Sequence, residues 1–133
     1  MSIRFEHFAL NLPEPVAFSA WYVDHLGCSV VAQAGPPKYT TFLADASGRT
    51  FVEVYHNPAA PVDDFAARAP LTFHFAFQTV DAAGLRERLL RAGASPVEEQ
   101  WPEVGTHLVM LRDPWGVPLQ LCQRSSPYPT RGH

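Results

Sequence analysis

One order of elements, strand–helix–strand–strand–strand, is predicted twice along this 133-residue chain, and it constrains the fold more than any other feature. His74 lies 67 residues after His7, and Gln120 lies 67 residues after Glu53. Each half offers an apolar sheet face that one helix can cover. The sequence therefore predicts an α+β fold of two tandem βαβββ modules, whose strands form a curved mixed sheet around one cleft.

The elements of each half are bounded by glycine and proline. Gly27 and Gly93 fit the left-handed residue that ends a helix, and Asp81 fits the N-cap of the second helix. Alternating and helical apolar spacings indicate the elements themselves. In the first half these are a strand over 3–11, a helix over 15–26, and strands over 29–33, 39–44 and 50–56. In the second half they are a strand over 71–79, a helix ending at Gly93, and strands over 95–99, 106–112 and 117–123.

The repeat sets the expected organisation of the chain as a single domain. Module one is predicted over 1–57 and module two over 70–124. The Pro- and Ala-rich stretch 58–69 is expected to connect them with at most a short helical turn, and the tail 125–133 is expected to be loose.

Charge and composition exclude several classes of partner. The formal net charge is −3 and the few basic residues are scattered, which speaks against a nucleic-acid binder. No apolar run approaches the roughly 20 residues needed to span a bilayer, and the first residues lack the pattern of a signal peptide. Only two cysteines occur, Cys28 and Cys122, each in an apolar setting. We expect a cytoplasmic protein with reduced thiols, whose partner is a small molecule or a second copy of the chain.

Four polar side chains are predicted near the middle of four different strands, among apolar or small neighbours. They are His7, Glu53, His74 and Gln120. Burying a carboxylate and two imidazoles is costly unless they are paired, and one divalent cation would satisfy them together. Nitrogen and oxygen ligands suit Zn, Ni, Co, Fe or Mn. A single mid-strand histidine is more often a hydrogen-bonded core residue, but the matched pair with Glu53 favours a metal site.

Four segments in order resemble the vicinal oxygen chelate superfamily, which includes glyoxalase I, bleomycin-resistance proteins, extradiol dioxygenases and methylmalonyl-CoA epimerase. The segments are EHFALNLPEPVAFSAWYVDHLG, RTFVEVYHN, LTFHFAFQTVDAAGLRERLLRAGA and LRDPWGVPLQLCQ. The resemblance implies metal ligands from the first, fourth, fifth and eighth strands, here His7, Glu53, His74 and Gln120. The eighth-strand ligand in such proteins is usually Glu, so ordinary glyoxalase chemistry is in question and Glu53 would take over the carboxylate's role.

The resemblance also implies a reaction class. A metal-dependent enzyme would stabilise an enolate or enediolate of a small oxygen-chelating substrate, as a lyase or isomerase does, with Glu53 as the catalytic residue. Candidate substrate-binding walls are Phe5, Phe51, Tyr55, Leu108 and Met110, although several of these would serve equally as core residues.

Two other functions stay open from the sequence. One is Fe(II)-dependent oxygen insertion of the extradiol type, which would need further His or Tyr side chains near the metal, whereas His107 is expected to point away from the cleft. The other is a metal-free small-molecule binding or sequestering protein of the bleomycin-resistance type. In all three readings the fold implies a homodimer, with the cleft either within one chain or shared between two.

Overall fold

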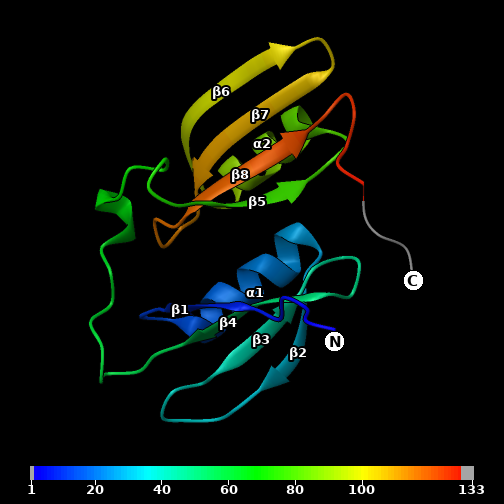
Figure 1. Ribbon diagram of the computed structural model, residues 1–133. Coiled ribbons are helices and arrows are strands. Elements are labelled where there is room, and N and C mark those ends of the chain that lie inside the picture. The colour runs from blue at the N-terminus through cyan, green and yellow to red at the C-terminus, as the bar shows by residue number, and fades with distance from the viewer. Residues whose placement is uncertain (1, 130–133) are drawn as a thin grey trace. The chain divides into compact units, whose positions relative to one another are not determined.

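The computed structural model describes residues 2–129, and the chain divides into two compact units between Asp63 and Asp64. Each unit holds one α-helix and one four-stranded sheet, which confirms the α+β fold of two βαβββ modules (Figure 1). The boundary between the units lies inside the predicted connector 58–69. The predicted tail falls partly on residues 130–133, which lie outside the described residues.

The first unit is built from one helix and a sheet of order β1-β4-β3-β2. β1 runs parallel to β4, and the other pairs are antiparallel. The bounds are β1 Phe8–Asn11, α1 Pro15–Leu26, β2 Ser29–Gln33, β3 Thr41–Ala44 and β4 Thr50–Tyr55.

Helix α1 forms where its sequence predicts. Pro15 occupies its first turn, and Gly27 ends it at a left-handed φ of 69°, with its N–H bonded to the carbonyl of Tyr22. Phe18 and Tyr22 are buried, with ring centroids 4.5 Å apart, on the face of the helix that covers β2, β3 and β4. On the opposite face of the sheet, Phe51, Glu53 and Tyr55 of β4 are partly exposed.

The second unit repeats the plan with a sheet of order β5-β8-β7-β6. β5 runs parallel to β8, and the other pairs are antiparallel. The bounds are η1 Phe65–Ala67, β5 Phe75–Gln78, α2 Ala82–Arg91, β6 Ser95–Glu103, β7 Thr106–Arg112 and β8 Pro118–Gln123. The 3₁₀ turn η1 is the short helical turn expected in the connector.

Helix α2 begins at the predicted cap, because Asp81 Oδ1 accepts a hydrogen bond from the Gly84 N–H at 3.0 Å. Leu85 and Leu89 are buried on the face that covers β7 and β8, where Val109 and Leu121 are also buried. Alternation along β7 and β8 then turns Leu108, Met110 and Gln120 to the other face of the sheet.

A matching Asp turn closes the last hairpin of each unit. Asp45 Oδ1 accepts from the Ser47 N–H at 2.9 Å, and Asp113 Oδ1 accepts from the Trp115 N–H at 2.9 Å. Gly116 in the second turn has a φ of 85°, and a Cβ there would stand 2.9 Å from the backbone nitrogen of Ala66. Glycine is therefore required where η1 packs on the β7–β8 turn.

Several predicted strands have other limits in the structure. The predicted strand 3–11 is regular only from Phe8, and the predicted strand 71–79 only from Phe75. The strand expected from residue 39 begins at Thr41, because Tyr39 has a left-handed φ of 53°. The strand expected over 95–99 continues to Glu103. His7 and His74 consequently lie just before a strand, not at its middle as predicted.

Both cysteines are free and buried, as expected. Within residues 2–129, no helix has the length and apolar character needed to cross a membrane.

Candidate functional site

The first unit brings two of the predicted site residues together. Glu53 on β4 is in register with Ala9 on the parallel strand β1, so their side chains lie on the same face, away from α1. His7 precedes Ala9 by two residues and reaches the same face. Its Nε2 atom lies 3.6 Å from Glu53 Oε1, with the two side chains 28% and 23% exposed.

The other ring nitrogen of His7 has a partner of its own. His7 Nδ1 donates to Glu6 Oε1 at 2.8 Å, because an ionised carboxylate can only accept. Phe42, opposite Glu53 on β3, meets the imidazole edge to face, with centroids 5.3 Å apart and planes at 89°. A neutral His7 ring therefore carries its proton on Nδ1 and turns the lone pair of Nε2 toward Glu53.

In the second unit, His74 has the same nitrogen engaged. Its Nδ1 lies 2.9 Å from the backbone carbonyl of Pro70, which can only accept a hydrogen bond. The neutral ring therefore holds its proton on Nδ1 and leaves Nε2 as a potential ligand. His74 is exposed and precedes β5.

Gln120 lies in the central strand β8 of the second unit. It is in register with Ala76 on β5 and Met110 on β7, on the face opposite α2. Its Oε1 accepts a hydrogen bond from the Cys122 thiol at 3.4 Å. No hydrogen bond joins Gln120 to His74 among the described residues; His74 precedes Ala76, the β5 partner of Gln120, by two residues.

Four of the predicted substrate-binding residues lie on the same sheet faces as Glu53 and Gln120. Phe51 and Tyr55 alternate with the core residues of β4 and so share the face of Glu53, and Leu108 and Met110 share that of Gln120. Phe5 is 60% exposed in the segment before β1. His107 lies on the opposite face, as predicted.

The four predicted ligands are less buried than the sequence suggested. The four residues were expected to be buried, but His74 is exposed and the other three are only partly buried. Desolvation therefore does not force a cation between them. In residues 2–129, no group of three or more His, Cys, Asp and Glu side chains forms a metal-binding cluster. The four-residue site stays a prediction, and the pair in the first unit is what the structure shows.

The geometry of that pair fits a cation. A separation of 3.6 Å is longer than an N–H···O hydrogen bond of at most about 3.2 Å. It suits two ligand atoms that each lie about 2.0–2.2 Å from one ion. The donors at hand are imidazole nitrogens, a carboxylate and an amide oxygen, which suit borderline and hard divalent metals. His7 and Glu53 are thus placed as two ligands of one divalent cation would be.

Sequence reasoning missed three partners of the histidines: Glu6, Phe42 and the carbonyl of Pro70. Glu6 was a candidate, because a metal-ligating histidine often donates its second N–H to a carboxylate and Glu6 is the adjacent residue. Phe42 could not be identified without knowing which residues of β3 and β4 lie opposite each other. The Pro70 carbonyl has no side-chain signature.

Sequence comparison defines the class of protein. The sequence profile of the Glyoxalase/Bleomycin resistance protein/Dioxygenase superfamily matches residues 4–121, and the chain belongs to this superfamily.

Among individual proteins, the chain is similar to an ethylmalonyl-CoA/methylmalonyl-CoA epimerase of Cereibacter sphaeroides. The two are 28% identical over 109 residues, covering 78% of this chain and 81% of the relative. Two solved structures share the fold. A variant of the fosfomycin resistance protein FosX from Listeria monocytogenes, complexed with Mn(II) and 1S,2S-dihydroxypropylphosphonic acid, has a TM-score of 0.69 at 17% identity, covering 91% and 92% of the two chains. The antibiotic binding protein TnmS3 from Streptomyces sp. CB03234 has a TM-score of 0.67 at 18% identity, covering 94% and 99%.

Proposed function

We propose that this protein is a metal-dependent enzyme that moves a proton at a carbon next to two chelating oxygens of a small substrate, as a lyase or isomerase does. The observation that carries the proposal is the pair in the first unit. His7 Nε2 faces Glu53 Oε1 at 3.6 Å while His7 Nδ1 is held by Glu6. Two electron-rich atoms that face each other in this way are stabilised by a cation between them.

The ligands that we propose are His7, Glu53, His74 and Gln120, for Zn, Ni, Co, Fe or Mn. When bound, the cation would act as a Lewis acid that stabilises an enolate or enediolate of the substrate. The two histidines offer Nε2 because Nδ1 of each is already bonded. Gln120 contributes a neutral amide oxygen, which cannot take up a proton at neutral pH.

Glu53 is the residue that we propose for proton transfer. Among the four proposed ligands, Glu53 has the only carboxylate, because Gln120 occupies the matching position on β8. Glu53 is therefore the ligand that could act as the base of the reaction. It is partly exposed and lies beside Ala9, a small residue that leaves space above the sheet. General acid–base catalysis by such a group contributes about 10²- to 10⁴-fold to a rate. The similarity to an epimerase supports a proton transfer of this kind.

Metal content tests the proposal directly. Chain purified without chelators and loaded separately with each of the five metals should retain about one equivalent of at least one metal per chain after desalting, measured by plasma mass spectrometry. His7→Ala and Glu53→Gln should each lower the retained metal to below about a tenth of an equivalent. His25→Ala, which removes an exposed histidine on α1, serves as the matched control and should retain the metal.

Retention below about a tenth of an equivalent by the unmodified chain, for all five metals, would instead support the metal-free binding protein. Two observations favour that second candidate. The amide of Gln120 offers both donors and an acceptor to a ligand, and TnmS3, which shares the fold, is an antibiotic binding protein. Extradiol-type dioxygenation receives no such support, because His107 lies on the face opposite Gln120.

A further inference from the structure

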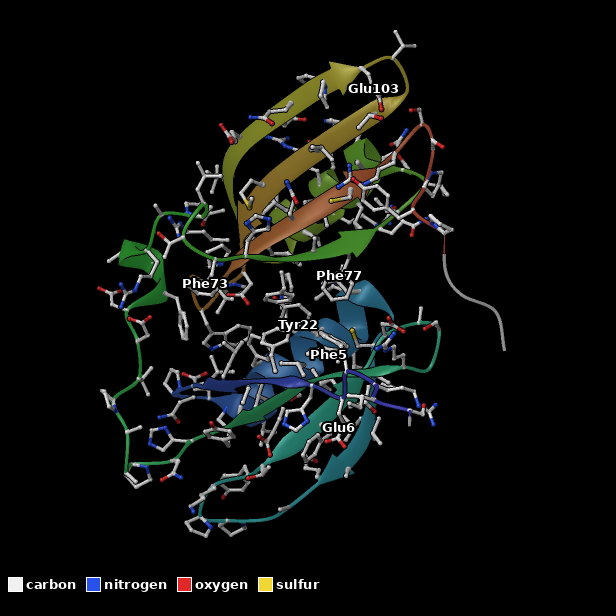
Figure 2. The ribbon with its side chains drawn as sticks, viewed as in Figure 1. Phe5, Glu6, Tyr22, Phe73, Phe77 and Glu103 are labelled. Atoms are coloured by element: carbon white, nitrogen blue, oxygen red, sulfur yellow. The ribbon has the colours of Figure 1, made fainter. Side chains whose placement is uncertain are left out.

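We propose that Glu6 is a positioning residue that holds His7 in the tautomer able to bind a metal. The inference rests on the proposed function, since it concerns a ligand of the proposed metal site. Figure 2 shows Glu6 and Phe5 in the segment that leads into β1 of the first unit. Among residues 2–129, Glu6 forms a hydrogen bond with His7 and with no other proposed ligand, so it would act through that imidazole ring.

The first step is the choice of tautomer. Free neutral histidine prefers its proton on Nε2, and in that form the nitrogen that faces Glu53 would have no lone pair to offer a cation. The hydrogen bond of 2.8 Å from His7 Nδ1 to Glu6 Oε1 reverses this preference, because the carboxylate stabilises the tautomer that has its proton on Nδ1. Nε2 is then free for the metal.

The second step is the orientation of the ring. Glu6 holds one side of the imidazole, and the edge-to-face contact with Phe42 fixes its plane. With both contacts in place, Nε2 points at Glu53. A metal-ligating histidine that donates its second N–H to a carboxylate is also a more basic ligand.

The two histidines differ in how they are held. His7 donates to an ionised side chain, whereas His74 donates to the backbone carbonyl of Pro70. A charged acceptor forms the stronger bond, so His7 should be the better electron donor of the two. The His7 tautomer can be altered by mutating Glu6, and the His74 tautomer cannot be altered in this way.

Nitrogen NMR of the metal-free, ¹⁵N-labelled chain tests the inference without any metal. At a pH where the rings are neutral, long-range ¹H–¹⁵N correlations, with His7 assigned through His7→Ala, should show Nδ1 protonated and Nε2 unprotonated. Glu6→Ala should move the proton to Nε2. Glu6→Gln, which keeps an acceptor oxygen, should retain the wild-type pattern. Glu14→Ala removes an exposed carboxylate of the same unit whose side chain makes no cap hydrogen bond, and it should change nothing.

Zinc titration of the same variants by calorimetry supplies the second measurement. Glu6→Ala should weaken zinc binding by about 10- to 100-fold, and Glu6→Gln by less than about tenfold. The inference is overturned if wild-type His7 carries its proton on Nε2, or if Glu6→Ala leaves the proton on Nδ1. A wild-type chain that has the expected tautomer, loses it in Glu6→Ala and retains none of the five metals would refute the proposed function while upholding the role of Glu6 on His7.

Discussion

At the scale of single residues, the account depends on which nitrogen of each histidine carries the proton. The repeat marked both histidines and the carboxylate as candidate metal ligands, and that role stays a prediction. It could not predict the tautomers, because the acceptor for His74 is the main chain of Pro70. It also overestimated burial, since a mid-strand position suggests a covered side chain whereas His74 is exposed.

The thiol of Cys28 gives a residue-scale prediction that does not depend on the metal. Burial, together with the negative charge of Asp45, raises the pKa of this thiol from 9.0 to about 12. Because only the thiolate reacts with a disulfide reagent such as DTNB, Cys28 of the folded chain should react at pH 8 more than about a hundredfold more slowly than in denaturant. The absorbance of the released thiolate, with Cys122→Ser to isolate Cys28, measures this.

The same shift fixes the sign of a pH dependence. The folded state holds the Cys28 proton more tightly than the unfolded chain does, so the resulting contribution to stability is complete below about pH 8.5. It is lost as the pH rises toward the folded-state pKa of about 12. Rapid labelling of folded Cys28 at pH 8 would contradict the burial on which both expectations rest.

At the scale of elements, helix ends were predicted better than strand ends. Gly27 and Asp81 act at the ends of α1 and α2 as expected, because a cap is a local interaction. Strand limits depend on partners. The β1–β4 ladder begins at Phe8, and the carbonyl of Phe5 is bonded instead by the Arg49 guanidinium at 3.2 Å. No periodicity in residues 3–7 signals that exchange.

The β6–β7 hairpin and α2 share a polar cluster of His107, Glu99 and Arg86 that was not predicted from the sequence. His107 Nε2 lies 2.9 Å from Glu99 Oε1, and the Trp101 ring stacks on the imidazole, with centroids 4.6 Å apart and planes at 10°. Arg86 of α2 approaches the other oxygen of Glu99, with Nε at 3.5 Å. The His107 side chain is only 10% exposed, so its hydrogen bond to Glu99 is shielded from water.

Removing Glu99 should therefore destabilise the second unit. Glu99→Ala removes the hydrogen-bond partner of the shielded His107 Nε2 and the ion pair with Arg86, so we expect the free energy of unfolding to fall by about 1–3 kcal/mol. Glu98→Ala is the matched control, because the neighbouring glutamate is exposed and points to the other face of β6; it should change stability by no more than about 0.5 kcal/mol. Urea unfolding followed by circular dichroism measures the free energy of unfolding of both variants. Equal losses in the two variants would show that the interactions of Glu99 with His107 and Arg86 do not stabilise the second unit.

At the scale of the whole molecule, the repeat predicted two βαβββ modules with the same order of elements along the chain, because each half closes a core of its own. The structure also has matched turns at Asp45 and Asp113, in corresponding hairpins of the two units. The two halves differ at one pair of proposed site residues, because the position of Glu53 in the first half is occupied by Gln120 in the second. Two similar modules thus carry different residues at matched positions, which in our proposal leaves one carboxylate to move the proton.

The central claim is that His7, Glu53, His74 and Gln120 hold one cation together, whether from one chain or from two. Anomalous diffraction from crystals grown with the metal that the chain retains tests it most directly. The account predicts one strong peak about 2.0–2.2 Å from His7 Nε2, Glu53 Oε1, His74 Nε2 and Gln120 Oε1. A well-ordered structure from such crystals with no peak beside His7, or with a peak that contacts only one of the two histidines, would contradict it.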